Sequence, residues 1–273
     1  MPQKLGKHFL KNKRTLRDIA DLVEIKNGET VIEIGSGHGE LSNFLIEDCL
    51  KKNTHLIMIE KDRRLANILK EKLMTQPQST QNEKIIVIEG DILKQLPEIS
   101  EKVANYKLVG NIPYYITGRL FRILEGLNNK PKKTVLTIQK EVALRVIAAK
   151  EKLNKLAASV QFWGEAEIKK IIPPEEFSPP PKVTSAVIVI RPKLKKPKIN
   201  RGDYFQAVKI IFKQPRKTVL NNVAESANAV SKDELVKILT NLKIDPRVRP
   251  ERLSLKDIIA IAQNLKALIK LKK

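Results

Sequence analysis

The sequence predicts an α/β protein with a seven-stranded, mostly parallel sheet over residues 1–195 and a small all-helical domain over residues 196–273. Three observations predict this fold class. From residue 30 onward, short runs rich in β-branched residues alternate with helical stretches, as in parallel sheets with crossover helices. Beyond about residue 195 the strand-like runs give way to amphipathic helical patterns. The connector between the two regions, KLKKPKINRG, is charged and contains Pro and Gly.

Five successive runs predict the parallel strands: ETVIEIGSGHGE (29–40), HLIMIEKD (55–62), KIIVIEGD (84–91), YKLVGNIPYY (106–115) and TVLTIQKE (134–141). The segments between them, such as 63–74 and 117–127, are predicted to be crossover helices. Two later runs, WGEAEIKKIIP and TSAVIVIRP, flank a proline-dense stretch and predict a closing antiparallel hairpin. These add to seven strands, with one reversed strand at the edge of the sheet.

The C-terminal region predicts helices only. Its amphipathic patterns are DYFQAVKIIFK, KTVLNNVAES, SKDELVKILTNL and SLKDIIAIAQNLKALIKL. At the start of the third pattern, Ser231 and Glu234 have the spacing of a capping box.

The charge of the chain restricts its partners. Its 273 residues include 52 Lys and Arg against 30 Asp and Glu, a formal charge of +22. Such a charge favours nucleic acid first and an anionic membrane surface second, although a Lys-rich solvated surface without such a partner stays open. No run approaches the ~18 apolar residues of a membrane span, and the N-terminus lacks the apolar core of a secretory signal. We therefore expect a cytoplasmic protein that acts away from membranes.

Several chemistries have no signal in the sequence. The single cysteine, Cys49, cannot form an intrachain disulfide or a zinc cluster by itself. No Ser/His/Asp set and no metal-ligand spacing is present, so we expect no metal site.

A glycine-rich turn, GSGHG (35–39), follows the first predicted strand. Glycines let a ligand approach the backbone, and the helix that follows offers free N–H groups, so the turn is a candidate nucleotide-binding loop. A tight strand-to-helix turn without a ligand is the alternative. The spacing is G-x-G-x-G, whereas a dehydrogenase favours G-x-G-x-x-G.

Two acids end the next two strands. Glu60 is placed to hold both hydroxyls of a ribose, and Asp91 to accept a hydrogen bond from an adenine amino group. Either acid could instead be a helix N-cap or a surface charge. Because ligands of open α/β sheets bind at the carboxyl ends of the strands, finding Gly, Glu and Asp at three such ends favours the binding site.

The fourth strand ends in Asn111-Ile112-Pro113-Tyr114. Adenine N6 is a poor nucleophile, because its lone pair is delocalised into the ring. The Asn111 side chain and the Pro113 carbonyl could accept the two N6–H bonds and localise that lone pair. Tyr114 would then stack on a flipped-out base. A proline turn without catalytic function is the alternative interpretation.

Phe177 lies in the proline-dense segment PPEEFSPPPKVTSAV. Prolines on both sides would hold it rigidly as a second face for the same base. A core anchor beneath the loop is the other possibility for this side chain.

Taken in order, these segments resemble the KsgA family of ribosomal RNA adenine dimethyltransferases, also called RsmA. LGKHFL is similar to the family's FGQNFL or FGQHFL, VIEIGSGHGELS to VEIGPGxGxLT, and VGNIPYYIT to GNLPYNIS. QKEVALR matches the segment that continues the fifth strand. FSPPPKVTSAV is similar to FxPPPKVDSAV, FKQPRKTVLNN to FxQRRKTLRNxL, and IDPRVRPERLS to IDPxxRAExLS.

The resemblance implies a Rossmann-like methyltransferase domain, a helical RNA-binding domain and S-adenosylmethionine as cofactor. It implies as target two adjacent adenosines near the 3′ end of 16S rRNA, within the small ribosomal subunit or its precursor. We expect the protein to act as a monomer in ribosome biogenesis. By matched position, the cofactor contacts are His8, Leu10, Gly35, Glu60, Asp91 and Asn111. The catalytic positions that we infer from the residues themselves are Asn111, Pro113, Tyr114 and Phe177.

The chain departs from the family pattern at a few positions. Lys7 replaces Gln, Tyr115 replaces the Asn after NLPY, Pro215 stands where Arg is usual, and LNKLAAS replaces a YGxLS segment. These departures bear on RNA contacts and target choice. Two other functions stay open: an Erm-type enzyme that methylates one adenosine of 23S rRNA, and a non-catalytic RNA-binding relative.

Overall fold

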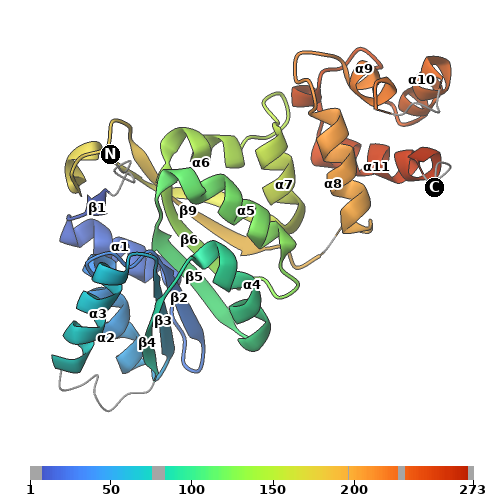
Figure 1. Ribbon diagram of the computed structural model, residues 1–273. Helices are drawn as coiled ribbons and strands as arrows, with labels where there is room; N and C mark the ends of the chain where they lie inside the picture. Colours follow the sequence, from blue (N-terminus) through green and yellow to red (C-terminus); the bar gives the residue numbers. More distant parts are fainter. Residues whose placement is uncertain (1–7, 76–83, 196, 227–230, 270–273) are drawn as a thin grey trace. The chain divides into compact units, whose positions relative to one another are not determined.

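The structure is a computed structural model that describes residues 8–75, 84–195, 197–226 and 231–269 (Figure 1). Contacts divide these residues into two compact units. The first unit takes the described residues of 1–143 and 165–192, and the second takes those of 144–164 and 193–273. As a division between catalytic and RNA-binding domains, the boundary between residues 195 and 196 stays a prediction.

A seven-stranded sheet forms the centre of the first unit, in the order β4-β3-β2-β5-β6-β9-β7. The pairs from β4 to β6 are parallel, and β9 is antiparallel to β6. The strands are β2 Thr30–Ile34, β3 His55–Glu60, β4 Ile85–Glu89, β5 Tyr106–Asn111, β6 Lys133–Gln139, β7 Gly164–Ile172 and β9 Ser185–Pro192. The predicted seven-stranded, mostly parallel sheet is confirmed.

The position predicted for the reversed strand was wrong. β9 does not lie at the edge of the sheet but between β6 and β7, so β7 is the edge strand. Residues 186–190 of β9 are fully buried, whereas β7 is buried only at its two end residues and is partly or fully exposed between them. The composition explains this order, because an internal strand needs apolar residues on both faces while an edge strand keeps charged ones.

Helices flank the sheet and connect its strands (Figure 1). In the first unit they are α1 Lys13–Val23, α2 Glu40–Lys51, α3 Arg63–Thr75, α4 Ile92–Lys102 and α5 Thr117–Gly126. Helix α6, Lys140–Val146, continues from the first unit into the second. α3 and α5 confirm the crossover helices predicted over 63–74 and 117–127.

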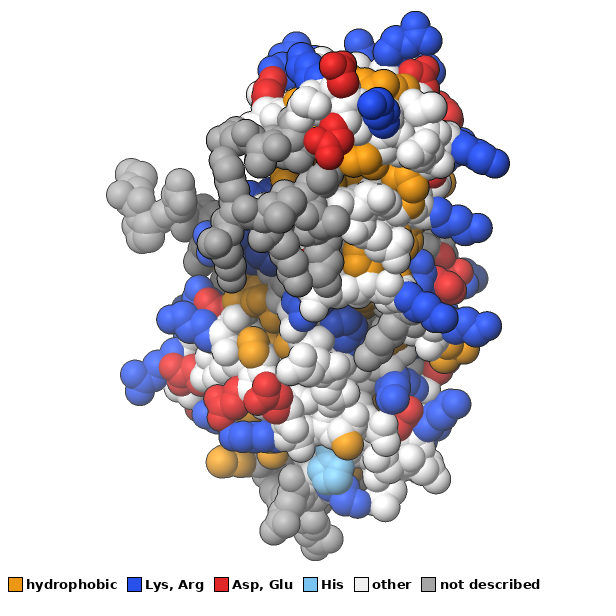
Figure 2. All heavy atoms as spheres, turned by 90° about the vertical axis from the view of Figure 1, so that its right-hand side faces the viewer, with side chains coloured by type: hydrophobic (Ala, Val, Ile, Leu, Met, Phe, Trp, Pro, Cys, Tyr) orange, Lys and Arg blue, Asp and Glu red, His pale blue; other side chains and the backbone are white. Residues whose placement is uncertain are grey.

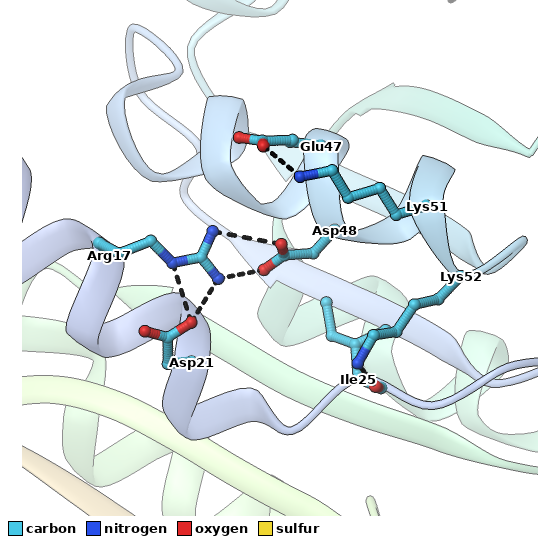
Figure 3. A network of polar contacts seen from close by, with 7 residues as sticks. All are labelled: Arg17, Asp21, Ile25, Glu47, Asp48, Lys51 and Lys52. Atoms are coloured by element: carbon cyan, nitrogen blue, oxygen red, sulfur yellow. Dashed lines mark hydrogen bonds and ion pairs between the residues drawn. The ribbon is translucent and has the colours of Figure 1, made fainter.

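Polar contacts join α1 to α2 on the outside of the sheet (Figure 3). The Arg17 guanidinium donates to Asp21 in its own helix at 2.8 Å and to Asp48 of α2 at 3.2 Å. Lys52, after the end of α2, donates to the Ile25 carbonyl at 2.8 Å. These contacts fix α1, which begins only three residues after a short strand at residues 9–10, and so help to place the N-terminal segment.

The second unit is helical. It contains α7 Lys155–Trp163, α8 Arg201–Ile211, α9 Val219–Ala224, α10 Lys232–Asn241 and α11 Leu255–Ile269. Tyr204 is fully buried, stacks on Phe162 with ring centroids 4.0 Å apart, and donates to the Ala158 carbonyl at 2.9 Å. Ser231 caps α10 by accepting from the Glu234 N–H at 3.2 Å, which is the N-cap half of the predicted capping box. Across the described ranges, no helix has the length and apolar character needed to cross a membrane.

Candidate active site

A pocket of about 310 Å³ opens at the carboxyl ends of β2, β3, β4 and β5. Eight of the nine predicted site residues line it: His8, Leu10, Gly35, Glu60, Asp91, Asn111, Pro113 and Tyr114. The parallel strands explain this convergence, because side chains that follow their carboxyl ends meet at one edge of the sheet.

The glycine loop forms one wall of the pocket. Gly35, Gly37 and Gly39 have φ values of 65°, 60° and 91°, a left-handed backbone that favours glycine. A Cβ on Gly37 would stand 2.9 Å from the Phe9 ring, so no larger residue fits beneath the N-terminal segment. The loop is therefore shaped both by its backbone and by the ring that covers it.

Glu60 ends β3 and holds the loop in place. Its Oε2 accepts from the Gly37 N–H at 2.9 Å, and its Oε1 accepts from the Asp62 N–H at 2.8 Å. The side chain is 6% exposed and faces the pocket. Because each carboxylate oxygen has two lone pairs, Glu60 can still accept hydrogen bonds from the hydroxyls of a ligand.

Asp91 ends β4 and also caps α4. Its Oδ1 accepts from the Leu93 N–H at 3.0 Å, and its Oδ2 pairs with Lys61 at 2.9 Å. Burial raises the pKa of Asp91, but the bonds from Lys61 and Leu93 outweigh it and hold the pKa below the usual value. The helix-cap interpretation is therefore correct, and the same carboxylate still lines the pocket.

Asn111 ends β5 with a fixed amide orientation. Its Nδ2 donates to the backbone carbonyl of His8 at 3.0 Å. A carbonyl can only accept, so the NH2 group must face it and Oδ1 must point elsewhere. No residue in the described ranges donates to Oδ1, which leaves this oxygen available to a ligand.

Pro113 and Tyr114 follow in a tight turn. The Pro113 carbonyl accepts from the Ile116 N–H at 3.1 Å and keeps its second lone pair. The Tyr114 hydroxyl bonds to Ser185 Oγ at 2.6 Å, and burial raises the pKa of Tyr114. The His8 ring lies nearly parallel to the Tyr114 ring, at 6.1 Å between centroids.

Phe177 is the predicted residue that does not line the pocket. It lies in β8, Phe177–Ser178, which pairs antiparallel with β1, Phe9–Leu10. Its side chain is 4% exposed and belongs to the same apolar core cluster as Leu10. In the structure it has the position of a core anchor beneath the loop, and its role in stacking stays a prediction.

Comparison with known proteins adds to this geometry. The family model described as "Ribosomal RNA adenine dimethylase" matches residues 2–266. The chain belongs to the ribosomal RNA adenine dimethylase family. It is thus an S-adenosylmethionine-dependent rRNA methyltransferase.

Individual relatives of the chain agree with this family. This chain is 35% identical over 93% of its length to the ribosomal RNA small subunit methyltransferase A of Dehalococcoides mccartyi, and the match covers 84% of that protein. A solved dimethyladenosine transferase from Plasmodium falciparum is 26% identical, with a TM-score of 0.77 over 96% of this chain and 99% of its own. The 23S rRNA methyltransferase ErmE is 20% identical over 94% of this chain and 99% of its own; its TM-score of 0.70 shows a shared fold.

Sequence reasoning missed Glu33, which also lines the pocket. This side chain is 1% exposed on β2 and accepts from Ser42 Oγ at 2.6 Å. Burial raises the pKa of Glu33 to about 7, against the hydrogen bond from Ser42 that lowers it. The acid inside the apolar run VIEI was the sequence feature that could have identified Glu33, since charged residues are rarely buried without a function or a partner.

The pairing of β1 with β8 was also missed. Two residues on each side form it, and they are 167 to 169 positions apart in the sequence. Neither segment has the length or the alternation that predicts a strand. The pairing brings the N-terminal segment to the proline loop, where His8 Nδ1 lies 2.7 Å from the Pro179 carbonyl oxygen.

Proposed function

We propose that the protein converts two adjacent adenosines of 16S rRNA, near its 3′ end, to N6,N6-dimethyladenosine in the small ribosomal subunit or its precursor. The observation that carries the proposal is the position of Asn111, Pro113 and Tyr114 in one pocket with Glu60 and Asp91. The residues proposed to hold the target adenine, called here the clasp (Asn111 and Pro113), thus share one cavity with the two acids proposed to bind the cofactor.

The residues of the pocket fit S-adenosylmethionine. Glu60 would hold the ribose hydroxyls, because its carboxylate is buried, fixed by two backbone donors and still able to accept. Asp91 would accept from the adenine amino group, and the glycine loop would allow close backbone approach. The cofactor supplies an electrophilic methyl group when it is bound.

Residues of the chain itself would position and activate the target adenine. Asn111 Oδ1 and the second lone pair of the Pro113 carbonyl would accept the two N6–H bonds. This arrangement draws N6 toward tetrahedral geometry and localises its lone pair for attack. Tyr114, pinned by Ser185, would offer a ring of fixed orientation to the base.

RNA as the substrate agrees with the charge of the chain. A net charge of +22 favours a polyanion, and Lys and Arg side chains are spread over the face drawn in Figure 2. The stretch 182–217 holds eleven Lys and Arg residues and one acid, Asp203. We assign RNA affinity to this stretch and to the C-terminal helices. We further propose that the whole protein acts as a monomer in the cytoplasm.

Mass spectrometry of adenosines tests the proposal. Immature small subunits and large subunits are incubated with the protein and labelled S-adenosylmethionine. We expect two adjacent dimethylated adenosines in 16S rRNA and no label in 23S rRNA. Label at a single 23S adenosine would favour the Erm-type function, and RNA binding without any label would favour a non-catalytic relative.

A further inference from the structure

An exposed stripe runs along the turn after Asn111 and the helix that continues it. The turn, η1 Tyr114–Ile116, leads directly into α5. Tyr115, Gly118, Arg119 and Arg122, called here the outer stripe, are all exposed. Their spacing of three and four residues places them on one side of the helical segment.

Tyr115 is the unusual member of the outer stripe. Its neighbour Tyr114 faces the pocket and is pinned by Ser185, whereas Tyr115 is 53% exposed at the rim of the same pocket. Successive residues of a 3₁₀ turn point about 120° apart, so one turn presents one ring inward and one outward. An exposed ring beside a pocket is a surface on which a base can stack.

Cations accompany the exposed ring. Arg119 lines the pocket rim with Tyr115 and Lys61. Lys61 is paired with Asp91, but the side chains of Arg119 and Arg122 make no hydrogen bond or ion pair with any described residue. At Gly118, between Tyr115 and the arginines, a Cβ would meet nothing within 4 Å. The outer stripe therefore offers an exposed aromatic face, an unobstructed surface at the glycine, and two guanidinium groups that are not paired with a described residue.

We propose that the outer stripe binds the nucleotide next to the target adenosine. Its base stacks on Tyr115, while Arg119 and Arg122 contact the phosphates that follow. This inference rests on the proposed function, because it requires one adenosine in the pocket against Tyr114. A substrate with two adjacent adenosines matches two rings on successive residues, one for the base being methylated and one for its neighbour.

Tyr115→Ala tests the stacking role, with Tyr115→Phe as the variant that keeps the ring. The probe is a hairpin RNA with 2-aminopurine in place of the adenosine next to the target, whose fluorescence falls on stacking. Tyr115→Ala should lose the fluorescence change and bind this RNA about tenfold more weakly, as expected for one stacked base. Tyr115→Phe should behave as wild type in both measurements, and calorimetry should give both variants the wild-type affinity for S-adenosylmethionine.

Arg122→Gln tests the phosphate contact. It should reduce the slope of log affinity against log salt by about one unit. The matched control is Lys132→Gln, which removes one exposed charge immediately before β6, at the end of the sheet away from the pocket. That variant should leave the slope unchanged.

Two outcomes would overturn the inference. Wild-type fluorescence and RNA affinity in Tyr115→Ala would leave the ring without a role. Weakened S-adenosylmethionine binding with unchanged RNA binding would make Tyr115 a cover of the cofactor instead. Failure of the proposed function is distinct, since wild type itself would then transfer no methyl group to small subunits.

Discussion

Replacing Glu33 with Gln removes a buried titratable group from the centre of the sheet while keeping its shape. Burial raises the pKa of Glu33 to about 7 in the folded protein, from 4.5 for the free group. Folding therefore favours the protonated form, and this stabilisation is fully present below pH 4.5 and is lost as the pH rises through 7. Since one pKa unit is about 1.4 kcal/mol, the loss amounts to about 3 kcal/mol.

Urea unfolding of wild type and Glu33→Gln at pH 5 and pH 8 measures this effect. The stability difference between the two proteins should change by about 2.5 kcal/mol in favour of the variant at the higher pH, because part of the loss has already occurred at pH 5. Groups distant from Glu33 titrate equally in both proteins, so they cancel from this difference. Parallel pH dependence of the two stabilities would show that Glu33 ionises at its ordinary pKa, and the reasoning from burial would then be wrong.

Three further changes probe the cofactor, the chemistry and the RNA. Glu60→Ala should weaken S-adenosylmethionine binding by about 1–3 kcal/mol, the scale of lost charge-assisted hydrogen bonds. Unchanged affinity by calorimetry, in a folded variant, would remove Glu60 from the site. Asn111→Ala should slow single-turnover methyl transfer about a hundredfold, and a rate near wild type would contradict the N6 clasp. Replacing the exposed Lys195 and Lys198 with Gln should lower the salt slope of RNA binding by about two units, with cofactor affinity unchanged. Equal slopes would leave this connector without a role; Lys196 lies outside the described residues.

Much of the fold and pocket could be predicted because the signals are local. The apolar runs and the residues at their ends give the parallel strands and, through one topological rule, the convergence of Glu60, Asp91 and Asn111 at one edge. The order of the strands within the sheet, by contrast, cannot be predicted from local sequence alone. Placing β9 inside the sheet required comparing its apolar run AVIVI with the charged residues spread along β7.

Long-range contacts account for what the sequence did not show about Phe177 and α7. Proline spacing alone does not distinguish a rigid stacking residue from a core anchor, and Phe177 is buried because β8 pairs with β1 from the other end of the chain. Helix α7 was missed because the sequence places it before the last strands, whereas its buried side chains pack with the C-terminal helices. Glu33 carried a local signal that could have been used, an acid within an apolar strand.

The β1–β8 pair lets the N-terminal segment position a residue of the pocket. His8 stands immediately before β1; its backbone carbonyl holds the Asn111 amide, and its ring nitrogen lies at the Pro179 carbonyl. The orientation of Asn111 Oδ1 is set by that amide bond, so it depends on where β1 is held. β1 in turn is held by β8 and by the apolar core that contains Leu10 and Phe177. Phe177 would thus support the proposed clasp on adenine from beneath, by fixing the strand that fixes Asn111, and its own stacking on the base stays a prediction.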